Sequence, residues 1–181
     1  IEATIGKLRS FQQGNGSFSY WPGDNDVNEW SSIYAGHFLL EAKSKGFSIP
    51  EGMLDRWTTY LEQTSRRWNA MTDNDFVGHY EHNLTQAYRL YALALAGKPD
   101  LSGMNRLKEQ KNQYQQSALM LAAAYATAGK PEVAKQLAST KWQDDFRYDW
   151  CGYTYGSDLR DRALLLETYT IMGDNARAQA M

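Results

Sequence analysis

The single cysteine and a nearby carboxylate are the first residues whose spacing could do chemistry. Cys151 lies two residues after Asp149, and with a remote histidine this pair would form a ligand set that zinc accepts. The third ligand would have to come from His37, His79 or His82. Because two ligands are weak evidence, we interpret Cys151 as a small, half-buried thiol in an aromatic loop and predict no metal site.

Two histidines three residues apart form the second candidate. One helix turn would bring His79 and His82 onto a shared face, as metal binding requires. The pair follows an acidic, glycine-containing stretch, so we expect a solvated loop before a helix that starts at Asn83. His37 falls within an apolar helical pattern, where a hydrogen-bonded core or groove residue is expected. We assign no role to these histidines.

Clustered carboxylates form the third candidate. Glycoside hydrolases use two carboxyl groups across a cleft, one of them with a raised pKa. Acidic residues are also ordinary in solvated loops and at helix starts. A carbohydrate-active enzyme, a glycoside hydrolase or lyase using Asp26, Asp75 and Asp145, is therefore kept as the alternative function. No phosphate-binding loop or nucleophilic serine motif is present, and we predict no catalytic residue and no cofactor. The clusters are Asp24 with Asp26 and Glu29, Asp73 with Asp75, and Asp144 with Asp145 and Asp149.

Charge and hydropathy exclude two classes of partner. The 181 residues carry a formal net charge of −2 at pH 7 without a basic block, which argues against nucleic acid or an anionic membrane surface. No run of about eighteen apolar residues occurs, so direct membrane insertion of this segment is not expected. Helical patterns run up to both ends without a cap or a stop, and we expect a fragment of a larger multidomain protein.

Internal repetition is the strongest signal for the elements that position these residues. Four times an apolar helix runs into a glycine and a second, more polar helix follows, which indicates helical hairpins. The first helices are apolar around most of their circumference and the second are amphipathic, so an inner layer wrapped by an outer layer is expected. The predicted pairs are Ile33 to Gly46 with Pro50 to Leu61, Leu84 to Gly97 with Leu101 to Lys108, Ala118 to Gly129 with Pro131 to Ala138, and Leu159 to Gly173 with Asn175 to Met181.

Two insertions interrupt the repeats, Arg66 to Asn83 and Lys141 to Ser157. Both are rich in aspartate, aromatic residues and glycine. In helical repeat proteins such insertions gather on one face, which is often the binding face. Within the second insertion and its sequel, Ser157 or Asp158 is expected to cap a helix, and the charges of Arg160-Asp161-Arg162 are expected to pair with neighbouring loops.

A glycine-rich aromatic turn precedes the first hairpin. Two glycines one residue apart and the alternating aromatic residues of Phe18-Ser19-Tyr20 predict a tight turn with a short extended arm, which Pro22-Gly23 closes. A helix follows, for which Ser31 or Ser32 is the expected N-cap. The turn and the helix that it feeds are typical of the repeating joint of alpha/alpha toroids.

Three stretches resemble the thioester-domain region of the alpha-2-macroglobulin and complement superfamily, most closely its bacterial members. The resemblance implies an all-α fold, an incomplete alpha/alpha toroid of helical hairpins like those of the terpenoid cyclase and protein prenyltransferase superfamily. It covers nearly the whole chain, and residues 1–181 are expected to form one toroid domain. The stretches are Gln12-Gln13-Gly14-Asn15-Gly16-Ser17-Phe18-Ser19-Tyr20-Trp21, Trp30 to Ala42, and Tyr155-Gly156-Ser157-Asp158-Leu159-Arg160-Asp161-Arg162-Ala163-Leu164-Leu165-Leu166.

The resemblance also implies a function. Such proteins are large, periplasmic or exposed at the cell surface, sometimes lipid-anchored, and they trap proteases after cleavage of a bait segment. The expected partners are target proteases and the other domains of the parent chain, and the expected role is non-catalytic. Many relatives carry a Cys-x-Glu-Gln thioester, but Cys151 is followed by Gly152-Tyr153-Thr154 and does not match. The thioester either lies upstream or is absent, and the acyl-directing role of a downstream histidine is not assigned to His79 or His82.

Overall fold

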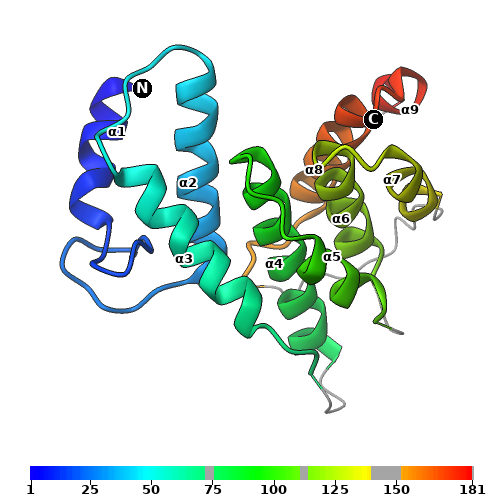
Figure 1. Ribbon diagram of the computed structural model, residues 1–181, viewed down its shortest axis with the longest axis horizontal. Coiled ribbons are helices and arrows are strands. Elements are labelled where there is room, and N and C mark those ends of the chain that lie inside the picture. The colour runs from blue at the N-terminus through cyan, green and yellow to red at the C-terminus, as the bar shows by residue number, and fades with distance from the viewer. Residues whose placement is uncertain (72–75, 111–113, 140–151, 181) are drawn as a thin grey trace. The chain divides into compact units, whose positions relative to one another are not determined.

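The computed structural model describes residues 1–71, 76–110, 114–139 and 152–180 (Figure 1). Within these ranges the regular elements are helices, and β pairing is limited to one isolated antiparallel bridge between Gln12 and Phe18. The expected all-α class is confirmed. The chain divides into two compact units, Ile1–Arg67 and Trp68–Met181. The ring of a toroid stays a prediction.

The first unit contains four helical elements. They are α1 (Glu2–Leu8), the 3-10 helix η1 (Arg9–Phe11), α2 (Glu29–Ser44) and α3 (Met53–Arg67). α3 is amphipathic and points Met53, Trp57 and Leu61 inward, one turn apart, where each is almost completely buried. Ile33 and Leu39 of α2 are likewise buried. The predicted Pro50 to Leu61 helix begins later than expected, because residues 51–52 form a turn before α3, and it continues to Arg67.

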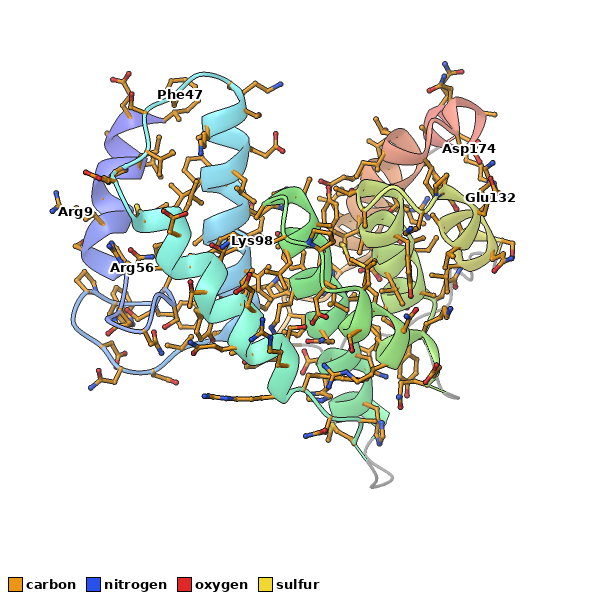
Figure 2. All side chains as sticks on the ribbon, in the orientation of Figure 1. Arg9, Phe47, Arg56, Lys98, Glu132 and Asp174 are labelled. Atoms are coloured by element: carbon orange, nitrogen blue, oxygen red, sulfur yellow. The ribbon has the colours of Figure 1, made fainter. Side chains whose placement is uncertain are left out.

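The glycine-rich turn is folded tightly against α3. The Gln13 N–H donates to the Ser17 carbonyl at 2.8 Å, and the Gly16 N–H donates back to the Gln13 carbonyl at 3.0 Å. Gly16 has φ +95°, and a Cβ built there would lie 2.2 Å from the Arg56 carbonyl oxygen. The Gln12 side chain links the turn to α3, donating from Nε2 to the Met53 carbonyl at 2.9 Å and accepting from Arg56 Nη2 at 2.8 Å. Figure 2 labels Arg56 on α3. The predicted turn is confirmed.

Gly16→Ala is expected to lower the free energy of unfolding by about 2 kcal/mol, because it combines a left-handed backbone with a collision against main chain. The measurement is a denaturant titration followed by tryptophan fluorescence. Gly14→Ala is the matched control in the same turn, since a Cβ there meets nothing within 4 Å. Equal losses for the two variants would contradict the prediction.

The N-cap of α2 differs from the expected serines. Asn28 is the cap, and its Oδ1 accepts the Ser31 N–H at 2.8 Å. Ser31 and Ser32 lie inside the first turn, because the chain enters the helix earlier than the apolar pattern shows. Ser32 instead joins three segments: its Oγ accepts the Phe18 N–H at 3.0 Å and its carbonyl accepts the Trp57 indole N–H at 3.0 Å.

The described residues of the second unit form three inner and three outer helices. The inner helix α6 (Gln115–Thr127) contacts α4 (Phe76–Leu95) and α8 (Asp158–Met172). Ten of its thirteen residues are buried, as expected of a helix with neighbours on several sides. The outer helices are α5 (Leu101–Lys108), α7 (Pro131–Ala138) and α9 (Asn175–Gln179), each joined to the preceding inner helix by a short turn. Figure 1 shows these hairpins in sequence from green to red.

The four predicted glycine stops are confirmed, and they share one hydrogen-bond pattern. In each, the glycine has positive φ and its N–H bonds the carbonyl three residues back, while the next N–H bonds the carbonyl five residues back, which is a Schellman motif. For Gly129 these bonds run to Ala126 at 3.0 Å and from Lys130 to Tyr125 at 2.8 Å. The four glycines are Gly46, Gly97, Gly129 and Gly173.

The start of α4 corrects the predicted insertion from Arg66 to Asn83. Arg66 belongs to α3, and α4 begins at Phe76, ahead of the expected start at Leu84. Tyr80 and Leu84, one turn apart, are both completely buried, so the apolar face of the helix extends through the segment expected to be a loop.

Tyr125 ties inner helix α6 to outer helix α5. Its hydroxyl donates to Asn105 Oδ1 at 2.7 Å, and Lys108 Nζ lies 5.9 Å from the ring centroid. Burial first, and the charge of Glu109 second, raise the pKa of Tyr125 above its ordinary value of 10.0. The folded state therefore holds this proton more tightly than the unfolded state.

The stability that Tyr125 contributes is fully present below about pH 10 and is lost as the pH rises through its raised pKa, with a slope of at most about 1.4 kcal/mol per pH unit. Tyr125→Phe is expected to make the fall of the free energy of unfolding above pH 10 shallower. Denaturant titrations between pH 9 and 11 measure the slope. Tyr34→Phe, at a residue 66% exposed, is the control and should leave it unchanged; identical slopes for the chain and Tyr125→Phe would contradict the prediction.

Candidate functional site

The carboxylate and cysteine candidates are only partly within the structure. Asp24, Asp26 and Glu29 lie in the first unit, where the Asp26 N–H donates to Asp24 Oδ1 at 3.1 Å in an exposed loop. Glu29 is the first residue of α2. The other candidates, Asp73, Asp75, Asp144, Asp145, Asp149 and Cys151, lie outside the described residues. The carbohydrate-enzyme alternative and the zinc hypothesis are thus untested predictions.

Histidines and carboxylates do not converge on a metal position in the described part of the chain, which contains no group of three or more potential ligands. His79 and His82 lie within α4, so the loop expected for them is wrong. His82 stacks on Trp68, with ring centroids 5.5 Å apart and an interplanar angle of 19°. Its Nε2 donates to the Asn69 carbonyl at 2.8 Å, which anchors the segment before α4. His37 is half-buried in α2.

A dense polar cluster lies where the N-terminal ends of the three inner helices of the second unit meet. Tyr80 in the first turns of α4 packs edge-on against Tyr114, the N-cap residue of α6, with centroids 5.5 Å apart. The Tyr80 hydroxyl accepts a hydrogen bond from Arg160 Nη2 of α8 at 2.7 Å. One tyrosine therefore touches the start of both other inner helices.

Arg160 is the centre of this cluster. The guanidinium donates to Asp161 Oδ1 from Nε at 2.8 Å and from Nη2 at 2.5 Å, and its Nη1 donates to the Thr154 carbonyl and hydroxyl at 2.8 and 2.9 Å. The side chain of Arg160 is 13% exposed and that of Asp161 is fully buried. The fork of an arginine suits such a multiple contact, which a lysine could not reproduce. The predicted pairing of these charges with a neighbouring loop is confirmed for Arg160.

The loop before α8 is held from a second side by α4. Glu81 Oε1 accepts the Thr154 N–H at 3.0 Å and its hydroxyl at 3.3 Å. Thr154 is completely buried, whereas Tyr153 and Tyr155 on either side of it are 41% and 53% exposed. Tyr155 has φ +52°, a left-handed conformation that a non-glycine residue keeps only where neighbouring contacts fix it. Ser157 caps α8, as predicted, by accepting the Arg160 N–H at 3.1 Å.

The electrostatics of the cluster favour a permanent charge pair. Burial alone would lower the pKa of the Arg160 guanidinium, but Tyr80 and Asp161 outweigh it and the pKa is raised. Arg160 is therefore cationic throughout the physiological range, and its protons are committed to hydrogen bonds with α4, α8 and the loop. This arrangement suits a clamp that displays the 152–156 loop more than it suits proton transfer. We name Tyr80, Glu81, Thr154, Arg160 and Asp161 the inner-helix clamp.

Sequence reasoning missed Tyr80, Glu81 and Thr154 in the clamp. Tyr80 and Arg160 are 80 positions apart, and no local pattern connects them. The available signal was the charged Arg160-Asp161 pair in the first turn of a helix that begins after a serine cap.

The chain has relatives among proteins of known name. No protein-family model matches the chain. Over 177 residues, 92% of the chain, it is 26% identical to an alpha-2-macroglobulin of Escherichia coli strain K12, and over 175 residues 29% identical to one of Xylella fastidiosa. The chain is homologous to one region of bacterial alpha-2-macroglobulins. It spans about a tenth of the length of these curated alpha-2-macroglobulins.

Solved alpha-2-macroglobulin structures show the same fold. Native Escherichia coli alpha-2-macroglobulin, spanning domain MG7 to the C-terminus, superposes with a TM-score of 0.78 at 23% identity, over 99% of this chain and 30% of that one. The trypsin-activated form gives 0.77 at 24% identity over 99% and 13% of the two chains. The form activated by porcine elastase gives 0.76 at 25% identity over 97% and 17%. The expected resemblance is confirmed.

Proposed function

We propose that the chain is a non-catalytic helical domain of an alpha-2-macroglobulin-like protein and that it contributes to protease trapping. The observation that carries the proposal is the similarity along 92% of the chain to alpha-2-macroglobulins of two bacterial genera. Structures of the Escherichia coli relative activated by trypsin and by elastase support a link to proteases. The domain acts through its surfaces and through contacts with the other domains of the parent chain.

The proposal includes the wider organisation of the protein. Residues 1–181 form one incomplete toroid domain, and the parent protein lies in the periplasm or at the cell surface, with or without a lipid anchor. None of the described helices has the length and apolar character to span a bilayer. Target proteases and neighbouring domains are the partners, and no metal or cofactor takes part.

The test uses the full-length parent protein. After incubation with trypsin or elastase, cleavage of a large protein substrate should fall at least severalfold, while cleavage of a small peptide substrate should remain near that of the free protease. Such a difference is the signature of a trapped but active protease. Equal cleavage of both substrates with and without the parent protein would overturn the proposal.

A variant pair connects the result to this domain. Arg160→Met, which removes the centre of the inner-helix clamp, is expected to reduce trapping of the protease. Arg162→Met, two residues further along the same helix and on a different face, is the control. Its side chain pairs with Asp158 at the surface, with 2.8 Å between Nε and Oδ2. Trapping that survives Arg160→Met unchanged would remove the clamp from the proposed mechanism.

A further inference from the structure

The Pro22-Gly23 turn presents an exposed tryptophan on a fixed backbone. The Asp24 N–H donates to the Trp21 carbonyl at 3.2 Å, and Gly23 at the third position has φ +80°, as a type II turn with proline at the second position requires. The Trp21 carbonyl also accepts the Ser19 hydroxyl at 2.7 Å. Trp21 as a whole is 70% exposed. A ligand that stacks on it would meet a backbone that is already ordered, which lowers the entropy cost of binding.

Two tyrosines extend the aromatic surface. Tyr20, 44% exposed, precedes Trp21, and its hydroxyl accepts a hydrogen bond from the Ser31 hydroxyl at 3.1 Å. Tyr34, one helical turn beyond Ser31 on α2, is 66% exposed. Aromatic side chains that remain exposed on rigid elements are the residue types that dominate interface energetics. We name Tyr20, Trp21 and Tyr34 the aromatic surface.

The charged residues of the segment that carries the turn, residues 10–42, are all acidic. Between Arg9 and Lys43 the sequence contains neither lysine nor arginine, but it contains Asp24, Asp26 and Glu29 directly after the turn. Asp24 closes the turn that carries Trp21, and Asp26 is exposed. An aromatic face attracts a cation through its quadrupole, and a neighbouring carboxylate adds a charge-assisted hydrogen bond.

The guanidinium group satisfies both features at once. It is planar and stacks on aromatic faces, and its N–H fork matches a carboxylate, whereas an ammonium group offers only a hydrated point charge. A neutral apolar partner would leave the carboxylates beside the interface without compensation. Charge complementarity therefore favours a partner surface that carries arginine.

We propose that the aromatic surface, with Asp24 and Asp26, docks an arginine-bearing segment of a neighbouring domain of the larger protein. The choice of a neighbouring domain rests on the proposed function, since the relatives are about ten times longer than this chain. The arginine chemistry rests on the turn itself and is tested separately.

The chemistry is tested on the chain of residues 1–181 with a tetra-arginine peptide blocked at both ends. A tetra-citrulline peptide is the matched probe, because citrulline keeps the planar shape and lacks the charge. Binding is followed by calorimetry and by tryptophan fluorescence. We expect the arginine peptide to bind at least tenfold more tightly than the citrulline peptide, and more weakly as salt increases. Equal affinity of the two peptides, or no binding of either, would overturn the proposal.

Single variants locate the contact. Trp21→Ala should weaken binding at least about fivefold, the loss expected from a cation–π contact. Asp24→Asn keeps the oxygen that accepts the Asp26 N–H and should weaken binding severalfold through charge alone. Leu159→Ala, at an exposed apolar residue of the second unit, and Glu132→Gln, at an exposed carboxylate, are the controls and should leave binding unchanged. Unchanged affinity in Trp21→Ala would place the peptide elsewhere and contradict the proposal.

Peptide binding to the larger protein tests whether a neighbouring domain occupies the aromatic surface. If a neighbouring domain already supplies the arginine, the tetra-arginine peptide should bind the larger protein at least tenfold more weakly than it binds the chain alone. Equal binding to both would overturn the neighbouring domain as the occupant. Protease trapping measured on the same protein reports on the proposed function independently, so failure of one test can be told from failure of the other.

Discussion

Arg160→Met should lower the free energy of unfolding by about 3 to 5 kcal/mol, the loss expected when one partner of a buried ion pair is removed. The substitution leaves the fully buried Asp161 carboxylate without the guanidinium, and it leaves the Tyr80 hydroxyl and the Thr154 carbonyl without their donor. Methionine fills much of the same volume, so the loss reports mainly on charge and hydrogen bonds. Chemical denaturation of the chain at pH 7 measures it.

Two further arginine variants make this expectation specific. Arg162→Met on the same helix should cost less than about 1 kcal/mol, because its pair with Asp158 is exposed to solvent. Arg160→Lys keeps the charge but cannot contact α4, α8 and the loop together, and an intermediate loss is expected. Similar losses for Arg160→Met and Arg162→Met would show that the clamp contributes no more than a surface pair.

Gly36→Ala should lower the free energy of unfolding by about 3 kcal/mol, at the upper end of the cost of overpacking a core. Gly36 lies inside α2, where alanine would ordinarily favour a helix by about 1 kcal/mol. A Cβ at this position would lie 1.9 Å from Cε2 of the completely buried Trp57. The indole cannot withdraw freely, because its N–H is bonded to the Ser32 carbonyl. Loss of tryptophan fluorescence in a urea titration reports the change.

A second glycine and a double variant complete the test. Gly6→Ala in α1, where a Cβ would meet nothing within 4 Å, should be neutral or stabilising by up to about 1 kcal/mol. In a Trp57→Leu background, Gly36→Ala should cost less than about 1 kcal/mol, since the ring that collides is gone. An undiminished cost in that background would refute the collision as the cause.

Local backbone chemistry made much of the fold predictable. The requirement for a left-handed residue after an inner helix singles out Gly97 and Gly129, and the following Pro99 and Pro131 support the same boundary. Both outer helices were predicted with the observed ends, Leu101–Lys108 and Pro131–Ala138. These signals act within a few residues, so sequence alone carries them.

The failures arose where a distant contact decides the local structure. The segment around His79 contains aspartate and glycine and reads as a loop, but Tyr80 is buried against residues near positions 114 and 160, and that packing extends α4 to Phe76. The cap of α2 was misplaced for a related reason. Ser32 is held inside the fold by Phe18 and Trp57, which leaves Asn28 to accept from the first turn.

The candidate site was predictable only in its charged part. Arg160 and Asp161 could be recognised as charged residues that were expected to pair with neighbouring loops. Thr154 and Glu81 are ordinary polar residues in the sequence, and only the fold brings them together. The sequence shows that aromatic residues are concentrated in this turn. Which of them are exposed depends on which face of the turn packs inward. Phe18, in the same turn, is buried and Trp21 is not.

The repeated Schellman stops have a consequence for how the chain acquires its structure. Each stop closes with bonds that reach back only three and five residues, and each inner helix contacts the outer helix that follows it. Loop closure therefore costs little entropy, and a hairpin can become ordered before the next one exists. We expect each hairpin of the second unit to gain structure as it leaves the ribosome, while the inner-helix clamp, which joins residues 80 positions apart, forms last. Arrest of translation between α7 and α8 would then leave the second unit with two helical hairpins that are ordered but loosely packed. Synthesis of α8 would allow the inner-helix clamp to form and complete their packing.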